Sequence, residues 1–336
     1  MNLKHKQVII WGYALHTHTH SYIHYGMYKA FKDLGFETYW IDPKKGWIYE
    51  GNPSNINFKD ALIFSEYFAD TIHIPRWKNS TYAVHYVGNK NHVPGAKEFL
   101  GKVGRFIDIR HCPMYYWEDK NYTFTMDDNI QKWVSKGCRL EKSPDYDRLY
   151  MNWATDLLPQ EFNFEDRKIK REKMSYFIGT IGGGRGGLDD CQKAPDKYDN
   201  VPALKKFRQA CIDAGVEFKS NCPWIKPMSD ADQKSAIQKS WVVPDIRHPA
   251  MKAWGYIPCR VMKNISYGQV GATNSRAVYD FFEQNVVYND DPYQLFFDCQ
   301  SKMNDLEFIL SQMNYVQKHH TYINRVKDLI NLVNNP

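Results

Sequence analysis

The chain has 336 residues, 43% of them hydrophobic, which is enough for two α/β domains that each bury a core of their own. No apolar run of about 18 residues and no signal-peptide pattern occurs, so the sequence predicts a soluble, cytoplasmic protein and argues against a membrane protein. The formal net charge of +6 is modest, which favours anionic ligands without indicating a nucleic-acid-binding face. The seven cysteines, an odd number without paired spacing, argue against a disulfide framework.

The first half opens with the pattern of a βαβ unit. Residues 7–12 form an apolar run that ends at glycine, residues 22–34 carry apolar side chains at helical spacing, and residues 37–42 have the composition of a second strand. Such a unit is the building block of a doubly wound parallel sheet. Further strands are predicted at residues 61–64, 82–87 and 105–109.

A polar stretch then separates the two halves of the chain. Residues 120–149 are irregular and polar, and residues 158–173 are charged without clear periodicity, as in connections between domains. We therefore expect an amino-terminal Rossmann-like domain over residues 1–170 and a carboxy-terminal Rossmann-like domain over residues 171–336.

The second half repeats the alternation of strands and helices. Strands are predicted at residues 174–181, 216–218, 241–244 and 285–288, and helices at residues 202–214, 230–239 and 257–267, with one long or broken helix over residues 305–333. The first of these strands opens into the glycine-rich turn 182–187, whose backbone N–H groups suit a phosphate. The turn has neither the P-loop spacing nor a clean GxGxxG pattern, so a surface loop remains the alternative.

A more specific pattern follows in Gly255-Tyr-Ile-Pro-Cys-Arg-Val-Met-Lys-Asn-Ile-Ser-Tyr-Gly268 and Gly271-Ala-Thr-Asn-Ser275. It resembles the donor-site helix and the small-residue turn of GT-B glycosyltransferases. The stretch His319-His-Thr-Tyr-Ile-Asn-Arg325 is similar to the H-T-Y-x-x-R signature in the terminal helix of the CgeB-like, group-one glycosyltransferases. The resemblance covers about residues 174–333.

The resemblance implies a GT-B fold, with two Rossmann-like domains facing across a cleft and a terminal helix that crosses back to the first domain. It also implies a glycosyltransferase that moves a sugar from a nucleotide-diphosphate donor, such as a UDP- or GDP-sugar, to a hydroxyl of a glycan or another acceptor. The donor belongs to the second domain and the acceptor mainly to the first. A divalent metal and other cofactors are not expected, because helix dipoles and basic side chains neutralise the leaving phosphate in this fold.

The chain departs from the family pattern at Lys263, where many relatives have an acidic residue that holds the donor ribose. Arg260 and Lys263 lie one helical turn apart and are expected to face the diphosphate together; solvated surface charges are the alternative. Asp245 and Arg247 follow a predicted strand at the edge where open α/β sheets bind ligands. The residues expected around the donor are Gly179, Gly183, Arg185, Asp245, Arg247, Arg260, Lys263, Tyr267, Thr273, Asn274 and Ser275.

A histidine-rich loop follows the first strand, and we expect one of its histidines to act as the general base on the acceptor hydroxyl. The candidates are His16, His18 and His20, with Tyr13, His24 and Glu66 as acceptor-binding residues. Asp42, Glu66 and Asp108 are alternative bases, because each ends or follows a predicted strand.

Other classes of function stay open. The loop from His16 to His24 also resembles the metal-binding opening of phosphoesterases and amidohydrolases, for which His73, His85, His92 and His111 would supply further ligands. A non-catalytic protein that binds nucleotides or glycans is a third class, and a DNA acceptor is a variant of the first. The D-x-D pattern at Asp145 and Asp147 is interpreted as a solvated loop.

Overall fold

The computed structural model describes residues 2–15, 20–42, 47–48, 53–66, 73–85, 103–110, 138–142, 147–182, 187–189, 199–222, 226–253 and 255–335. These residues divide into two compact units. Those before Pro159 and those from Thr321 onward form the first unit, and those from Pro159 to His320 form the second. None of the helices in the described ranges is long and apolar enough to cross a membrane.

The first unit is built on one eight-stranded sheet in the order β3-β2-β1-β4-β5-β6-β8-β7. Its strands are β1 (Gln7–Trp11), β2 (Glu37–Asp42), β3 (Trp47–Ile48), β4 (Ala61–Glu66), β5 (Thr81–His85), β6 (Arg105–Arg110), β7 (Cys138–Lys142) and β8 (Asp147–Met151). Six of them run parallel, and β3 and β7 lie antiparallel at the two edges. The strand order reverses between β1 and β4, so the carboxyl ends of these two strands form the topological switch point of the unit.

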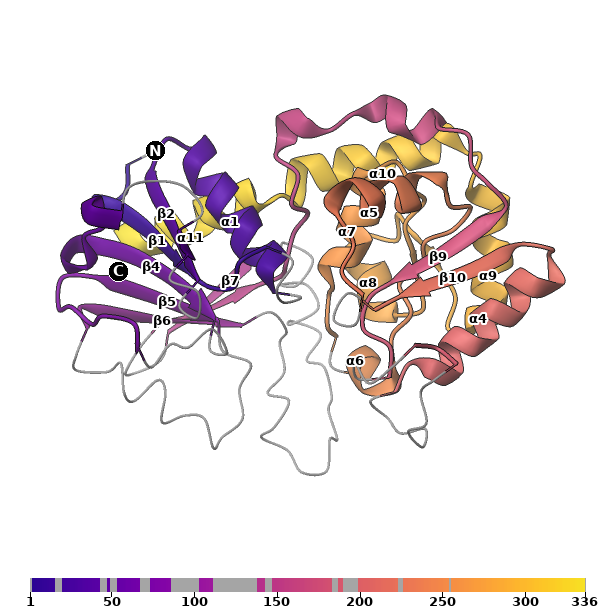
Figure 1. Ribbon diagram of the computed structural model, residues 1–336, viewed down its shortest axis with the longest axis horizontal. Coiled ribbons are helices and arrows are strands. Elements are labelled where there is room, and N and C mark those ends of the chain that lie inside the picture. Colours follow the sequence, from indigo (N-terminus) through magenta and orange to yellow (C-terminus); the bar gives the residue numbers. More distant parts are fainter. Residues whose placement is uncertain are drawn as a thin grey trace. The chain divides into compact units, whose positions relative to one another are not determined.

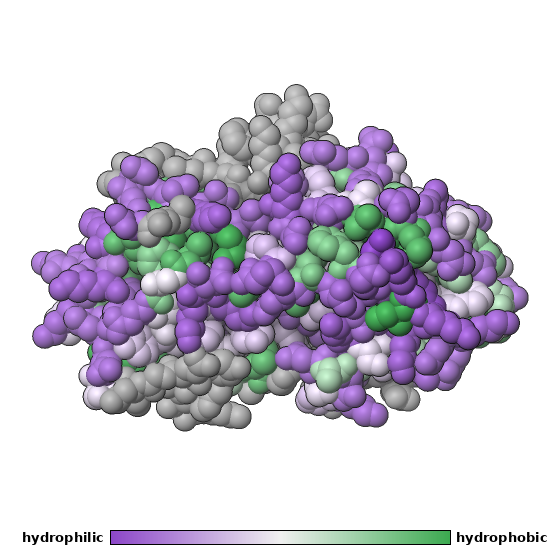
Figure 2. All heavy atoms as spheres, turned by 90° about the horizontal axis from the view of Figure 1, so that it is seen from above, coloured by the Kyte–Doolittle hydropathy of each residue, from purple (hydrophilic) through white to green (hydrophobic). Residues whose placement is uncertain are grey.

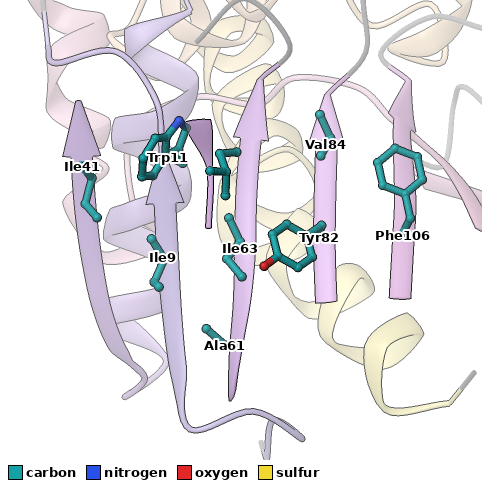
Figure 3. Close-up of a cluster of buried hydrophobic side chains, with 9 residues drawn as sticks. Ile9, Trp11, Ile41, Ala61, Ile63, Tyr82, Val84 and Phe106 are labelled. Carbon is teal, nitrogen blue, oxygen red and sulfur yellow. The ribbon is translucent and has the colours of Figure 1, made fainter. Parts of the chain in front are cut away.

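The core of this unit follows the two-residue period of the strands. Ile9 and Trp11 of β1 and Ile63 of β4 point to the same face, next to Tyr82 and Val84 of β5 (Figure 3). The alternate residues face the other way, where α1 (Ser21–Asp33) packs against β1 and β2. Both faces of the central strands are therefore apolar, as expected for a parallel sheet.

The last helix of the chain, α11 (Tyr322–Asn334), belongs to the first unit and packs against α1 (Figure 1). The two helices approach closely at Gly26, where an added Cβ would lie 2.1 Å from the ring of Tyr322. The guanidinium of Arg105 in β6 donates to the carbonyls of Leu332 and Val333, which satisfies the free carbonyls at the end of the helix.

The second unit has a shorter parallel sheet that is assembled from separate pieces. Strands β9 (Met174–Ile178) and β10 (Glu217–Asn221) pair with each other, as do β11 (Ala272–Thr273) and β12 (Val287–Tyr288). The extended segment 241–245 joins the two pairs. The N–H of Trp241 donates to Met174, and that of Asp245 to Ala272. The resulting strand order is β10-β9-(241–245)-β11-β12. As in the first unit, the order reverses beside the strand that comes first in the sequence, here between β9 and the segment 241–245.

Helices surround this second sheet. They are α4 (Val201–Asp213), α5 (Asp230–Lys239), α6 (Pro249–Ala253), α7 (Cys259–Ser266), α8 (Arg276–Phe281), α9 (Pro292–Lys302) and α10 (Leu306–His319). The predicted α/β class with two Rossmann-like units is confirmed. The predicted boundary near residue 170 stays a prediction, although the described residues pass from one unit to the other at Pro159.

The face seen in Figure 2 is mostly hydrophilic, with small separate hydrophobic areas. Trp77, Ile212 and Leu306 are the large hydrophobic side chains that are exposed in the described part of the chain. They come from different elements, and scattered exposure of this kind is normal for a globular protein.

Candidate anion-binding site

The carboxyl ends of β9 and of the segment 241–245 meet at the switch point of the second unit, where open α/β sheets bind ligands. Gly179 directly follows β9 and has a φ of +155°, a conformation that favours glycine. A Cβ at this position would lie 1.7 Å from Nη2 of Arg260. The backbone at Gly179 therefore leaves room for the Arg260 guanidinium, which the sequence had placed with it in one site.

Arg260 is the second residue of α7, whose first turn is preceded by Pro258. Its guanidinium lies over the ring of Phe177, 4.5 Å from the ring centroid, and 15% of its side chain is exposed. Burial lowers the pKa of Arg260 to about 10 and the nearby charge of Arg247 adds to this shift, while Asp245 opposes it. Arg260 is thus a charged group in a site with little water.

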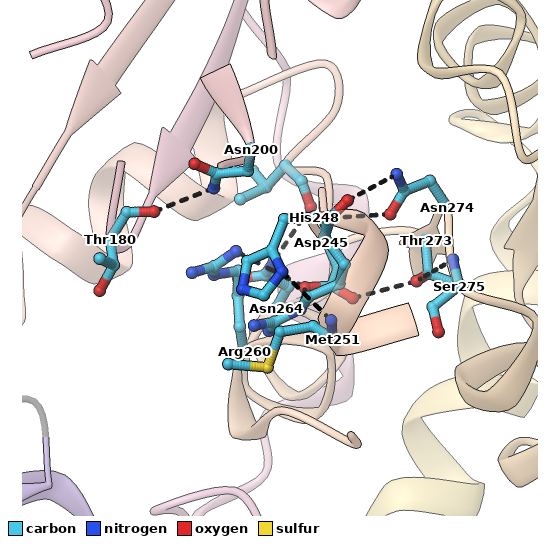
Figure 4. A network of polar contacts seen from close by, with 12 residues as sticks. Thr180, Asn200, Asp245, His248, Met251, Arg260, Asn264, Thr273, Asn274 and Ser275 are labelled. Atoms are coloured by element: carbon cyan, nitrogen blue, oxygen red, sulfur yellow. Dashed lines mark hydrogen bonds and ion pairs between the residues drawn. The ribbon is translucent and has the colours of Figure 1, made fainter. Parts of the chain in front are cut away.

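Asp245 is completely buried and forms ion pairs with both Arg247 and Arg260. Figure 4 shows Asp245 close to Arg260 and Thr273. Its Oδ1 is 2.6 Å from Nε of Arg247 and 3.5 Å from Nη1 of Arg260. These distances define ion pairs. The N–H bonds of the two guanidinium groups do not point at Asp245 Oδ1, so neither pair forms a hydrogen bond to that oxygen. Within the described residues, Asp245 Oδ1, Arg247 Nε and Arg260 Nη1 are buried without a hydrogen-bond partner.

The cluster therefore holds one more positive than negative charge in a buried setting. Each buried polar group that lacks a partner costs on the order of 1–3 kcal/mol. An anion that accepts hydrogen bonds from Arg247 Nε and Arg260 Nη1 would remove this cost for the two donors and offset the excess positive charge. Guanidinium groups suit phosphate oxygens in particular, because their N–H donors match the geometry of the anion.

Thr273 and Asn274 hold the cluster in place from the end of β11. Thr273 Oγ1 donates to Asp245 Oδ2 at 3.0 Å and accepts the N–H of Ser275. The amide of Asn274 bonds both the N–H and the carbonyl of Arg247, at 2.7 and 3.1 Å. The side chains of Thr273 and Asn274 thus position the residues that carry charge, whereas the buried Ser275 Oγ has no hydrogen-bond partner among the described residues.

The first part of the glycine-rich turn is fixed by Asn200, the residue before α4. Its side chain accepts the N–H of Gly182 at 3.1 Å and donates to the carbonyl of Thr180 at 3.0 Å. Thr180 and Gly182 are thereby held next to the carboxyl end of β9. Gly183 and Arg185 lie outside the described residues.

Lys263 and Tyr267 lie toward the carboxyl end of α7. The Nζ of Lys263 is 5.8 Å from the ring centroid of Tyr267, and Lys234 of α5 approaches the same ring at 5.6 Å. The structure therefore brings Gly179, Asp245, Arg247 and Arg260 together at the switch point, but gives Lys263 and Tyr267 a separate cluster of contacts.

Three residues that frame the site were not among the predicted site residues. Asn200 fixes the turn, Asn264 Nδ2 donates to the carbonyl of Val243 at 2.9 Å, and His248 Nδ1 accepts the N–H of Met251 at 3.1 Å. A polar residue within a helix or just before one is common, so spacing could not have distinguished these three.

Two of the predicted acceptor residues in the first unit are buried. The ring of His24 is completely buried, packs near Tyr13 and Phe64, and lies so close to Gly12 that a Cβ there would be 2.3 Å away. Desolvation lowers the pKa of His24 to about 3. Tyr13 is 8% exposed, and these two side chains fill the core behind the switch point.

Among the three candidate bases, His20 is the one that the structure describes. It precedes α1, is partly exposed, and its ring lies 5.7 Å from that of His85. His16, His18 and the side chain of Glu66 lie outside the described residues. Of the other carboxylates, Asp42 accepts the N–H of Ala14, and both oxygens of Asp108 bond Nε of Arg110.

Within the described residues, no group of three His, Cys, Asp or Glu side chains is placed to hold a metal ion. His92 and His111 lie outside these residues. Asp147 forms an ion pair with Arg105 and is mostly buried, so its interpretation as part of a solvated loop is wrong. The neighbouring strand β6 supplies the arginine, a partner that the local sequence around Asp147 does not reveal.

Comparison with known proteins shows a likeness to solved structures. No protein-family model matches the chain, and no curated protein matches it. A solved structure described as "alpha-glucosyltransferase (AGT) in complex with UDP" has a TM-score of 0.52 and 7% sequence identity, over 98% of this chain and 99% of that chain. The chain therefore has the α/β fold of a GT-B glycosyltransferase, while membership of the CgeB-like group stays a prediction.

Proposed function

We propose that the protein is a glycosyltransferase that takes a sugar from a nucleoside-diphosphate sugar and transfers it to an acceptor hydroxyl. The observation that carries this proposal is the pair of buried guanidinium groups at the switch point of the second unit, with one carboxylate between them. The fold likeness to a glucosyltransferase bound to UDP adds support and favours UDP as the nucleotide.

The donor's diphosphate would bind Arg247 and Arg260, beside the backbone at Gly179. In the transfer, the acceptor oxygen forms a bond to the anomeric carbon, and the bond from that carbon to the diphosphate oxygen breaks. The nucleoside diphosphate leaves with the electron pair, so negative charge develops where the guanidinium groups point. Stabilising such charge by preorganised groups in a site with little water is usually the largest catalytic effect. No metal is needed for this step.

The acceptor proton needs a base, and the histidine loop supplies the candidates. Since His24 is buried and binds a proton weakly, we assign it a packing role together with Tyr13. His20 is the described histidine of the loop that has a partly exposed side chain. We retain it with His16 and His18 as the candidate bases.

Nucleotide binding tests the proposal most directly. We expect UDP to bind the wild-type protein in the presence of EDTA, and Arg260→Gln to weaken binding about 10- to 100-fold, because a hydrogen bond to a charged group is lost. Isothermal titration calorimetry with UDP, GDP and ADP measures this and identifies the base. Arg208→Gln is the matched control, since Arg208 lies on α4 and pairs with Asp189 at the surface.

Transfer itself is checked by release of the nucleoside diphosphate from a sugar nucleotide when acceptors are added. Absence of binding to any nucleoside diphosphate, or equal binding by the Arg260→Gln variant, would contradict the proposal. A large loss of stability in EDTA together with absent nucleotide binding would instead favour a metal-dependent hydrolase that uses the histidine loop.

A further inference from the structure

The carboxylate of Asp245 occupies one side of the two guanidinium groups that an anion would also use. Its Oδ2 is anchored by Thr273 Oγ1 at 3.0 Å, whereas its Oδ1 faces Arg247 and Arg260 without a hydrogen bond to either. The carboxylate is therefore fixed by one oxygen, and the guanidinium groups sit at the ends of long side chains. Such an arrangement lets the arginines turn their N–H groups to a new acceptor while Asp245 stays in place.

We propose that Asp245 is a positioning residue that competes with the phosphates of the ligand for Arg247 and Arg260, and thereby limits how tightly the nucleoside diphosphate product is held. The identity of the ligand rests on the proposed function. The competition rests on the geometry of the cluster alone.

Electrostatics gives Asp245 opposite effects in the two states of the site. Without ligand, the carboxylate keeps two guanidinium groups from repelling each other in a setting where all three side chains are at most 15% exposed. With a diphosphate bound, the same carboxylate lies a few ångströms from further negative charges and opposes them. Asp245 thus stabilises the unliganded protein and weakens anion binding.

This competition bears on turnover. A site that held a diphosphate with two unopposed arginines would release its product slowly, and changes in affinity at one site act mainly through the dissociation rate. Product release limits the rate of many enzymes. Asp245 would keep the product from being retained, and Thr273 contributes by fixing the position of the carboxylate.

Asp245→Asn separates this effect from a structural role. Asparagine has the same shape and can still accept the hydrogen bond from Thr273, but it carries no charge. We expect the variant to melt at a lower temperature without ligand, yet to bind inorganic pyrophosphate and UDP about tenfold more tightly in calorimetry. If Asp245 were a structural residue alone, stability and affinity would fall together, and unchanged or weaker pyrophosphate binding would overturn the proposal.

A charge-restoring pair of variants covers the case in which Asp245→Asn does not fold. Arg260→Gln makes the cluster neutral, and adding Asp245→Asn to it restores the single net positive charge of the wild-type protein. We expect the double variant to bind pyrophosphate about tenfold more tightly than Arg260→Gln. Equal or weaker binding by the double variant would overturn the proposal, as would absent pyrophosphate binding by every protein in the series.

The two proposals fail in different ways. If the wild-type protein binds pyrophosphate but no nucleoside diphosphate, and the order of the variants holds, the proposed function is wrong and the competition stands. If the wild-type protein binds UDP and Asp245→Asn weakens that binding, the competition is wrong and the proposed function stands.

Discussion

The buried imidazole of His24 makes stability depend on pH. Its pKa is about 3 in the folded protein, mainly because burial disfavours the charged form, whereas an unfolded chain has a value near 6.5. Between these values the unfolded chain binds a proton that the folded protein does not. The stabilising contribution of neutral His24 is therefore complete above pH 6.5 and is lost as the pH falls toward 3.

We expect the free energy of unfolding to fall by about 2 kcal/mol from this group alone between pH 6.5 and pH 5. His24→Gln removes the titrating group, so its unfolding free energy should be less sensitive over the same range, even if its stability at pH 7 is lower. Urea unfolding at both pH values measures the difference. The control is His73→Gln, since His73 is exposed. If wild type and His24→Gln showed equal pH dependence, the assignment of this pH dependence to His24 would be refuted.

For single residues, the sequence predicted which residues lie at the site better than it predicted what each side chain does there. Gly179, Asp245, Arg247 and Arg260, which the sequence assigned to one donor site, lie close together in the structure, while their role in binding a donor stays a prediction. The sequence could not show that the side chains of Thr273 and Asn274 form hydrogen bonds within the protein and thereby position charged residues. The partners in these hydrogen bonds come from segments distant in sequence. Asn274, for example, bonds the backbone of Arg247.

Among the elements, α1 and α11 approach each other closely at Gly26. Gly26→Ala would place a Cβ 2.1 Å from the Tyr322 ring, so the helices would have to separate or the ring would have to move. We expect a loss of about 1–3 kcal/mol in unfolding free energy, reduced in part by the better helix propensity of alanine. Denaturant unfolding measures this loss.

A double-mutant cycle supplies the control for Gly26→Ala. Tyr322→Leu opens space at the same place, so the double variant should lose less stability than the sum of the two single changes. Additive losses would mean that Gly26 matters for a reason other than its contact with Tyr322.

The elements that the sequence predicted well are those with a clear apolar period. β1, α1, β2, β4, β5 and β6 all lie where the pattern indicated, within a few residues. β7 and β8 were missed, since Cys138–Lys142 and Asp147–Met151 mix charged and apolar residues and pair with each other at the edge of the sheet. The helix predicted at residues 305–333 is broken at His320 and Thr321, where Thr321 and Asn324 form a capping box that starts α11.

For the molecule as a whole, the first unit is discontinuous in sequence, because α11 completes it from the far end of the chain. A chain that ends at His320 lacks the buried residues Tyr322, Val326, Leu329 and Ile330. We expect such a chain to expose the core of the first unit, with increased hydrogen exchange in β1, α1 and β2, while the segment from Pro159 to His320 keeps its protection. A uniform increase over both units would show that the units do not fold separately.

The sequence could indicate two units, because the chain is long enough for two cores and each half repeats the alternation of strands and helices. The position of α11 came from a family resemblance and not from its amphipathic pattern, since such a pattern does not say which sheet a helix covers.

The placement of α11 also sets the order of events during synthesis. The ribosome makes the strands of the first unit before it reaches Pro159, but the helix that packs against α1 emerges only after His320. The second unit has all of its residues as soon as His320 is free of the ribosome. The first unit is therefore completed only after all described residues of the second unit have been made, and until then the apolar surface of α1 that α11 covers stays exposed.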